Sequence, residues 1–541
     1  MKIVLVYPPE LFSASQVASA VLAPLGISYI AANLIKHGHD VHIIDALGES
    51  PEQFVPFGNH RTRGLTIHET VDRIPDDADW IGISSLYSSM WPATLAVIRE
   101  TKQRFPDVPI VLGGPHPSSY PGMVMSEPAV DYIIHSEGEK SALQFIDALE
   151  GRRELHEIDG FVWRHNGNGY RTAKKEYLSA EELDELPMPC RDLLPMENYI
   201  RCKESHGANR GRSTTMLASR GCPYKCSFCT TPLLWTTKFR VRSPANVVDE
   251  ILHLKDTYQV TDIHFVDDNL TVSRRWTQDF ARELIDREVD VTWQLSTGVR
   301  VETVDRATLE LMKASGCSNI AFAPESGNER VLKEVLTKTI KPEKVKEAAQ
   351  EAIDVGMKVC LFFIAGAPGE AKAEAEDSIS FARDVAKLGV DEASFSKFSP
   401  LPGTKLFDRL LREGEVRIDR EFYESLGYQS ELGRARSWNE EMTDEELRRL
   451  AQRAFRTFFL TSFISHPFKA LRTMTNLLLQ RQETKLDRYV QRTFKVVARR
   501  LLGRQQQRHA PQNWPEEAAS EPAAIVDYPL GADLPTVSLE S

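Results

Sequence analysis

Short β-branched segments alternate with amphipathic helical patterns over the first 150 residues. The strand-like segments end at Gly, Pro or Asp, and apolar positions at helical spacing lie between them, as in residues 27–37 and 92–104. These segments are residues 2–7, 40–44, 80–84, 110–112 and 132–134. The alternation predicts a parallel sheet with helices on both faces, which binds ligands at the carboxyl ends of its strands.

A second alternating series runs from about residue 212 to about residue 410. Its strand-like segments are residues 215–218, 262–266, 291–296, 319–323, 358–364 and 392–398. Six strand–helix units with short loops predict a partial (β/α)6 barrel whose site lies at the carboxyl ends of the strands. Residues 151–211, between the two series, are interpreted as a linker.

The remainder of the chain contains two segments of different composition. Residues 411–508 follow helical patterns and are rich in Phe, Leu and Arg. Residues 509–541 are rich in Pro, Ala and Glu and contain no Lys or Arg, which is typical of a disordered tail. The chain is therefore expected to have an α/β domain (1–150), a linker, an α/β barrel (212–410), a helical C-terminal domain and a tail.

Composition narrows the class of protein. A length of 541 residues exceeds one ordinary core, and 42% apolar with 26% charged residues is typical of globular domains. The net charge of −11 gives no support to nucleic-acid binding. No export signal is evident, and no apolar run approaches the ~18 residues of a spanning helix. Three of the seven cysteines crowd into eight positions, which predicts metal or redox chemistry in a reducing cytoplasm.

These three cysteines are Cys222, Cys226 and Cys229, on the loop that follows the first predicted barrel strand. Three thiolates on one loop can ligate three irons of a four-iron cubane and leave the fourth iron open for a bidentate ligand. The alternative is a zinc site, but structural zinc needs four protein ligands and no fourth Cys or His lies at a suitable local spacing. The pattern favours a cluster.

The spacing Cys222-x3-Cys226-x2-Cys229, with Phe228 before the third cysteine, resembles the signature of the radical S-adenosylmethionine (radical SAM) superfamily. The resemblance extends strand by strand through residues 212–410. It implies a [4Fe-4S] cluster held by the three cysteines, with S-adenosylmethionine at the open iron. The positions implied to contact this cofactor are Phe228, Asp267, Asp268, Asn269, Ser296, Arg300, Glu325, Ser326 and Gly366. The segment at Asp267 departs from the commonest Gly-Gly-Glu form of the family.

The first domain resembles the Rossmann-like cobalamin-binding module of one branch of this superfamily. Its strand-end loops are implied to contact cobalamin through Pro8, Ser84, Leu86, Tyr87, Gly113, Gly114, Glu137 and Gly138. Asp40-Val41-His42 lacks the glycine of the Asp-x-His-x-x-Gly motif, so no histidine ligand to cobalt is expected from it. Leu86 or Tyr87 would meet the lower face, with His116 as an alternative. A spacer domain without a cofactor is the competing interpretation.

The resemblance implies a cobalamin-dependent radical SAM methyltransferase, which methylates an unactivated carbon through a 5′-deoxyadenosyl radical and methylcobalamin. One alternative is an oxidative or ring-forming enzyme like the family's porphyrin cyclase. Another, of a different class, is a non-catalytic cobalamin carrier or sensor. No acid, base or nucleophile is assigned, and the substrate and oligomeric state stay open.

The last helical region carries an unusual charge balance. Residues 448–508 contain fifteen Lys and Arg against two acids, with aromatic residues and leucines between them. The preferred interpretation is a helical cap over the barrel; the alternatives are a surface that rests on an anionic membrane, or recognition of a phosphate-bearing substrate. The expected partners are a small or lipophilic substrate and an electron donor such as flavodoxin or ferredoxin, and no nucleic acid. The protein is expected in the cytoplasm; the alternative is a peripheral location at the inner face of the membrane.

Overall fold

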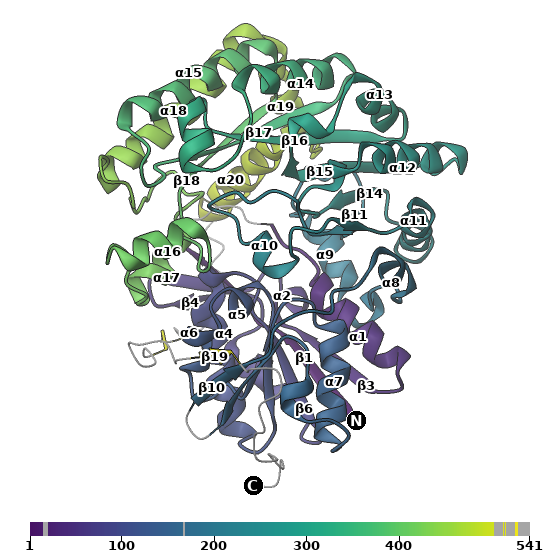
Figure 1. Ribbon diagram of the computed structural model, residues 1–541. Helices are drawn as coiled ribbons and strands as arrows, with labels where there is room; N and C mark the ends of the chain where they lie inside the picture. The colour runs from purple at the N-terminus through teal and green to yellow at the C-terminus, as the bar shows by residue number, and fades with distance from the viewer. Residues whose placement is uncertain (14–19, 166–167, 502–511, 513, 516–524, 528–541) are drawn as a thin grey trace.

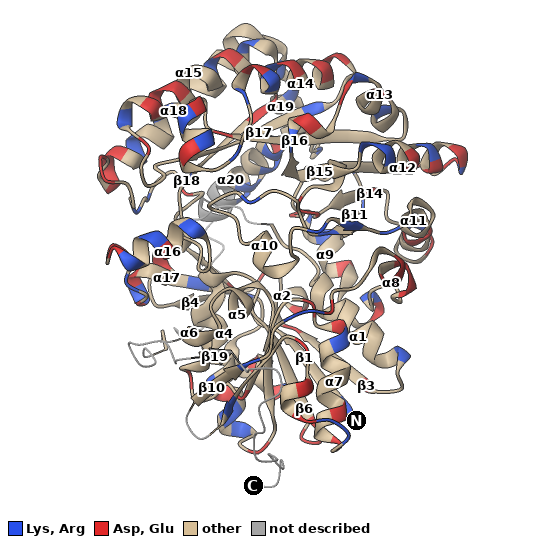
Figure 2. Ribbon diagram, viewed as in Figure 1, with Lys and Arg blue, Asp and Glu red and all other residues tan. Residues whose placement is uncertain are grey.

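The computed structural model describes residues 1–13, 20–165, 168–501, 512, 514–515 and 525–527. Two bodies make up the molecule: the N-terminal sheet domain lies below in Figure 1 and the barrel above it. Near their junction lie α2 (Ala46–Glu49), α9 (Met196–Cys202) and α10 (Thr231–Leu234). Lys, Arg, Asp and Glu are intermixed along the outer barrel helices α12 to α15 and α18 (Figure 2). Among the described helices, none combines the length and apolarity needed to span a membrane.

The N-terminal domain is built on a parallel sheet, as predicted. Its order is β19-β10-β9-β8-β7-β6-β1-β3, and the five strands from β8 to β3 run parallel. Their bounds are β1 (Lys2–Tyr7), β3 (Asp40–Asp45), β6 (Trp80–Ser84), β7 (Ile110–Gly113) and β8 (Tyr132–Ile134). Both faces are buried, which explains the continuous apolar runs in the sequence. The accompanying helices are α1 (Leu25–Lys36), α2 (Ala46–Glu49), α3 (Ile67–Asp72), α4 (Trp91–Arg104), α5 (Pro115–Ser119), α6 (Pro121–Met125) and α7 (Glu139–Leu149).

This sheet continues past residue 150, where the sequence predicts a linker. Antiparallel β9 (Phe161–His165) and β10 (Asn168–Arg171) extend it because Phe161 and Trp163 alternate into the core, where Phe161 stacks on Tyr132. The rest of the predicted linker holds α8 (Ala180–Glu185) and α9 (Met196–Cys202).

The predicted tail, 509–541, falls mostly outside the described residues. Its described strand β19 (Ile525–Asp527) pairs in parallel with β10. A separate sheet of β2 (Glu10–Ser13), β5 (His60–Arg63) and β4 (Phe54–Phe57) lies within the first 63 residues.

The second domain is the predicted six-stranded open barrel. Its parallel strands follow chain order: β11 (Ser213–Met216), β14 (Asp262–Phe265), β15 (Thr292–Val299), β16 (Cys317–Glu325), β17 (Lys358–Ala365) and β18 (Glu392–Lys397). Phe265 and Trp293 pack outward against Phe280 of α12, while alternate positions such as His264 and Gln294 face inward. The outer helices are α11 (Pro244–Tyr258), α12 (Arg274–Asp286), α13 (Arg306–Ala314), α14 (Pro342–Asp354) and α15 (Lys372–Leu388).

The last helices close the open side of this barrel. They are α16 (Lys405–Arg412), α17 (Arg420–Leu426), α18 (Asp444–Ser465), α19 (Pro467–Leu478) and α20 (Lys485–Leu501), in agreement with the predicted helical region. The start of α20 bridges the two edge strands: Leu486 N donates to Glu392 of β18, and Arg488 donates to the carbonyls of Ser205 and Gly207, shortly before β11.

Candidate functional site

The three motif cysteines lie on a tightly held loop at the carboxyl end of β11. The loop leaves β12 (Ser219–Arg220), which pairs with β13 (Arg240–Val241), through Gly221 at φ +87°. A Cβ at Gly221 would lie 2.3 Å from the Lys238 carbonyl oxygen, so only glycine fits. Cys222, Cys226 and Cys229 are free and half-buried.

The donor set fits a cluster better than a single metal ion. Burial raises the thiol pKa values, that of Cys229 to about 11, and Cys226 raises the pKa of both others, so the sulfurs lie near one another. They nevertheless do not all fall within 4.8 Å of one another. Ligands bound to one zinc at ~2.3 Å would stand about 3.8 Å apart, whereas a cubane spreads three ligands over three irons.

Two cations stand beside these sulfurs. Lys338 and Arg300 both lower the pKa of Cys226 against the effect of burial. The Arg300 guanidinium lies 3.9 Å from the centre of the Tyr224 ring, and Lys338 Nζ pairs with Glu325 Oε1 at 2.9 Å. The sequence singled out Arg300 and Glu325 but missed Lys338, which belongs to no motif. Both cations can balance the negative charge of thiolates or of a carboxylate-bearing ligand.

The two aspartates after β14 have different surroundings. Asp267 is buried and accepts from the backbone N–H groups of Ala218 and Ser219 and from the Ser219 hydroxyl, so it fixes the start of the cysteine loop. Burial raises its pKa to about 7. Asp268 is exposed and accepts from Thr231 Oγ1 at 2.8 Å, the atom that also lies 3.3 Å from Cys229 Sγ.

The other positions predicted to contact S-adenosylmethionine cluster at the same edge of the barrel. The Nδ2 of Asn269 is buried and has no partner among the described residues, so a donor is available. Ser296 O accepts from Lys485 Nζ at 3.2 Å, and Gly366 N donates to Glu370. Ser326 is buried between Asn328 N and the Ser378 hydroxyl, while Phe228 packs against the core. The polar groups of Ser326 are therefore satisfied within the protein.

The predicted cobalamin loops lie side by side at the top of the N-terminal sheet. Ser85 N donates to Gly113 O at 2.9 Å, and His116 N donates to Ser85 O at 3.2 Å. Gly114 adopts φ +109°, and a Cβ there would lie 2.6 Å from Ser85 O. Pro8 directly follows β1, and Ser84 is the last residue of the parallel neighbour β6, so both lie at the carboxyl edge of the sheet.

Tyr87, on one of these loops, lies within electrostatic range of the barrel. Its side chain is 51% exposed, and the surrounding protein together with the carboxylates of Glu10 and Asp268 raises its pKa to about 12. Tyr87 and Asp268 thus lie within electrostatic range of each other although they belong to different domains, and both residues are exposed. With partly buried Leu86 beside it, the Tyr87 ring offers an open apolar surface that a flat macrocycle such as a corrin fits.

Glu137, predicted to touch cobalamin, has strong protein partners instead. Its Oε2 accepts from Leu178 N at 2.8 Å, and its Oε1 lies 2.5 Å from Arg240 Nη1. Glu139 pairs with Arg220 at 2.5 Å. Gly138 lies between these carboxylates, where a Cβ would meet Ile30 at 2.9 Å. These buried ion pairs bind the sheet domain to β12 and β13, the two strands that flank the cysteine loop.

Neither histidine considered as a cobalt ligand is placed for that role. His42 is exposed and lies 3.5 Å from Asp40, as expected for a residue inside β3. His116 is 1% exposed, packs on Trp91, and its Nδ1 lies 2.9 Å from Ser88 Oγ. Burial lowers the pKa of His116 to about 3.

The buried His116 predicts an acid-sensitive fold. In the unfolded chain the His116 imidazole binds a proton below about pH 6.5, whereas in the folded chain it stays neutral down to about pH 3. The free energy of unfolding therefore decreases as the pH falls through this window. Between pH 7 and pH 5 this costs the wild type about 2 kcal/mol. Denaturant unfolding of His116→Gln should show a flatter pH dependence, while the exposed control His42→Gln should follow the wild type. Parallel curves for all three proteins would contradict the assignment.

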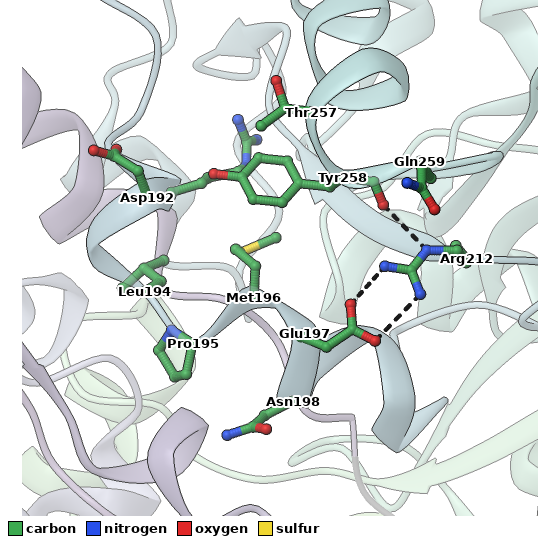
Figure 3. A pocket seen from close by; sticks show the side chains of 11 residues that line it. Asp192, Leu194, Pro195, Met196, Glu197, Asn198, Arg212, Thr257, Tyr258 and Gln259 are labelled. Carbon is green, nitrogen blue, oxygen red and sulfur yellow. Dashed lines mark hydrogen bonds and ion pairs between the residues drawn. The ribbon is translucent and has the colours of Figure 1, made fainter.

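A separate cavity of about 570 Å³ lies at the amino end of β11, at the opposite end of that strand from the cysteines. Figure 3 shows that Arg212 lines this cavity. Its guanidinium donates two hydrogen bonds to the Glu197 carboxylate and one to the Tyr258 carbonyl oxygen. Since its lining comes from α9, the end of α11 and the residues before β11, it is remote from the predicted cofactor contacts.

Comparisons with known proteins agree with this arrangement. Residues 216–382 match the model of the radical SAM superfamily, and residues 16–146 match that of the B12 binding domain. An uncharacterized methyltransferase of Pyrococcus horikoshii is 30% identical over 463 residues, which cover 85% of this chain and 93% of the relative. Cytidylyl-2-hydroxyethylphosphonate methyltransferase of Streptomyces wedmorensis is 31% identical over 474 residues, or 80% and 86% of the two chains.

Among solved structures, the radical SAM methyltransferase TsrM of Kitasatospora setae has a similar fold. The TM-score is 0.62 at 18% identity, and the match covers 77% of each chain. At this identity the likeness concerns the fold, in which a sheet domain and a radical SAM barrel are combined.

Proposed function

The chain belongs to the cobalamin-dependent radical SAM methyltransferases, and we propose that it methylates an unactivated carbon of a small-molecule substrate. Its cofactors are a [4Fe-4S] cluster, S-adenosylmethionine and cobalamin. The observation that carries the proposal is a contact between the two sets of loops. Ser136 Oγ, beside the predicted cobalamin contacts Glu137 and Gly138, donates to Leu233 O at 3.3 Å, four residues after Cys229. Tyr87 also lies within electrostatic range of Asp268.

When bound, the cluster and S-adenosylmethionine supply a carbon radical by one-electron cleavage, and cobalamin supplies the methyl group. Cys222, Cys226 and Cys229 would hold three irons as thiolates. Arg300 and Lys338 would stabilise the negative charge of these thiolates and of the methionyl carboxylate. Asn269, whose buried Nδ2 has no hydrogen-bond partner among the described residues, would offer a further donor.

Other residues near the cysteines hold the cysteine loop in place through hydrogen bonds. Asp267 holds the beginning of the cysteine loop through Ala218 and Ser219, and Thr231 links Cys229 to Asp268. Burial of these contacts keeps water from the backbone that shapes the loop. The electron needed for each cleavage would come from an external donor, for which flavodoxin or ferredoxin has the suitable chemistry.

Methyl transfer can be tested before the substrate is identified. The full chain, reconstituted anaerobically with iron, sulfide and hydroxocobalamin, is given a strong reductant and S-adenosylmethionine with a deuterated methyl group. We expect 5′-deoxyadenosine and trideuteromethyl-cobalamin by mass spectrometry. Formation of 5′-deoxyadenosine without labelled cobalamin would favour the ring-forming alternative, and absence of both products would favour a carrier or sensor.

Tyr87 provides a test of the cobalamin site. Tyr87→Ala removes an exposed ring whose contact contributes about 1 kcal/mol, so cobalamin should bind about fivefold more weakly. Tyr87→Phe keeps the ring and should bind as the wild type does. Binding is measured by titration of the visible spectrum, with iron content as an independent readout that should not change. Tyr489→Ala, at a 43% exposed tyrosine of α20, is the matched control; an equal loss there would count against the assignment.

A further inference from the structure

Helix α19 lies on the surface, but its polar side chains face the protein and most of its exposed side chains are apolar. Its polar residues face the protein: Lys469 Nζ donates to Gly389 O at 2.6 Å and Val390 O at 2.9 Å, and Arg472 pairs with Asp391 at 2.9 Å. Asn476 is buried and donates to Asp487. Apart from Thr475, the exposed positions of α19 are apolar, with exposed fractions of 81% for Phe468, 60% for Leu471, 65% for Met474 and 82% for Leu478.

The exposed apolar surface continues beyond α19. Leu460 and Ile464, 62% and 80% exposed, stand one turn apart at the end of α18, and Leu479 follows α19 at 55%. We call these seven residues the apolar patch: Leu460, Ile464, Phe468, Leu471, Met474, Leu478 and Leu479. Since α18 and α19 pack together, the two groups of exposed apolar residues lie on neighbouring helices. Contiguous exposed apolar surfaces of this kind mark binding sites for proteins or membranes.

Charge around the patch favours an anionic surface. Arg456 lies one turn before Leu460 on α18, Arg481 follows Leu479, and Lys495 neighbours exposed Phe494 on α20. These three cations are exposed, and none has a side-chain partner within the part of the chain that the structure describes. The two acids of residues 448–508 leave little free negative charge: Asp487 is buried, and half-buried Glu483 lies 3.8 Å from Arg472.

A second copy of this chain is a poorer occupant. A two-fold contact through the patch would bring the same three cations of each copy together, and like charges across an interface are unfavourable. Phosphate headgroups have the opposite sign, and the apolar side chains can enter the boundary between headgroups and acyl chains.

We propose that the patch binds the surface of an anionic lipid bilayer, with α19 lying in the interface plane and Arg456, Arg481 and Lys495 contacting headgroup phosphates. This attachment is peripheral, because none of the described helices can cross a membrane. It is independent of the proposed methyl transfer, since no patch residue lies among the predicted cofactor contacts. The preferred interpretation of this region as a barrel cap still holds for its inner face, and the outer face gains a second role.

The test is sedimentation of the full-length holoenzyme with vesicles of phosphatidylcholine alone or mixed with phosphatidylglycerol. We expect binding to the anionic vesicles, which weakens as salt screens the charges. Phe468→Ser/Leu478→Ser should bind at least about tenfold more weakly, because two exposed apolar side chains leave the interface. Arg456→Glu/Arg481→Glu should bind weakly even though the apolar residues remain.

Ile35→Ser is the matched control, because Ile35 is an exposed apolar residue (42%) on α1, in the other domain. It should bind as the wild type does. All variants are checked for wild-type iron content and unfolding, so that misfolding cannot imitate lost binding. Equal binding of the wild type and Phe468→Ser/Leu478→Ser, or equal binding to neutral and anionic vesicles, would overturn the proposal. So would a dimer in solution that the same double substitution makes monomeric while no variant binds vesicles.

Discussion

Replacement of Cys222, Cys226 or Cys229 by alanine is expected to leave a folded protein with neither a stable cluster nor 5′-deoxyadenosine formation. Each cysteine would ligate a different iron, so the loss of one thiolate removes one of the three ligands that the loop supplies to the cluster. The measurements are iron and acid-labile sulfide per chain after anaerobic reconstitution, and 5′-deoxyadenosine by mass spectrometry. Both should fall to background.

The other cysteines give the controls. Cys190 is also free and half-buried, but it lies in the segment between the two domains, so Cys190→Ala should keep the cluster and the activity. Cys202→Ala, Cys317→Ala and Cys360→Ala should do the same. If Cys190→Ala lost as much iron as Cys226→Ala, the ligand assignment would be wrong.

Substitution of Arg220 by methionine is expected to have the largest effect on stability. Arg220 is 4% exposed, pairs with Glu139 at 2.5 Å and lies 3.7 Å from Glu137. Its removal leaves buried carboxylates with fewer partners, which costs about 3–5 kcal/mol of unfolding free energy. Because Arg220 stands two residues before Cys222, iron content should fall as well. Anaerobic denaturant unfolding and iron analysis measure the two effects.

Two further variants make this test specific. Arg275→Met removes an arginine that is 93% exposed, and it should change the unfolding free energy by no more than about 0.5 kcal/mol. Glu139→Gln, added to Arg220→Met, removes one buried charge and should recover part of the loss. A shift for Arg220→Met no larger than that for Arg275→Met would show that the pair with Glu139 contributes little.

Local patterns predicted the main elements because those elements are buried on both faces. The runs from Lys2 to Tyr7 and from Lys358 to Ile364 are long enough for their apolar residues to identify a strand in any surroundings. The extension of the first sheet was not predictable in this way. Phe161 and Trp163 become core residues only because Tyr132 and Phe145, distant in the sequence, lie beneath them.

The same distinction between local and distant contacts decides which site residues could be predicted. The cysteines and the loops at strand ends were identified from spacing and family resemblance, which depend on neighbouring residues. Lys338 was missed because it belongs to no motif and gains its role from its contact with Glu325 in the folded barrel. The partners of Glu137 and Glu139 were missed because these ion pairs cross the boundary between the two domains. No property of the sequence near Glu137 distinguishes a carboxylate that pairs with Arg240 from one that binds a ligand.

The pairing of β19 with β10 has a consequence for biosynthesis. Translation runs from the amino end, so the edge of β10 emerges from the ribosome long before the strand that covers it. The barrel and all the C-terminal helices must be made in between. During this interval the nascent chain presents an open strand edge, which is a template for intermolecular pairing. Loss of residues 525–527 should therefore lower the yield of dispersed protein more than it lowers the turnover of the molecules that survive.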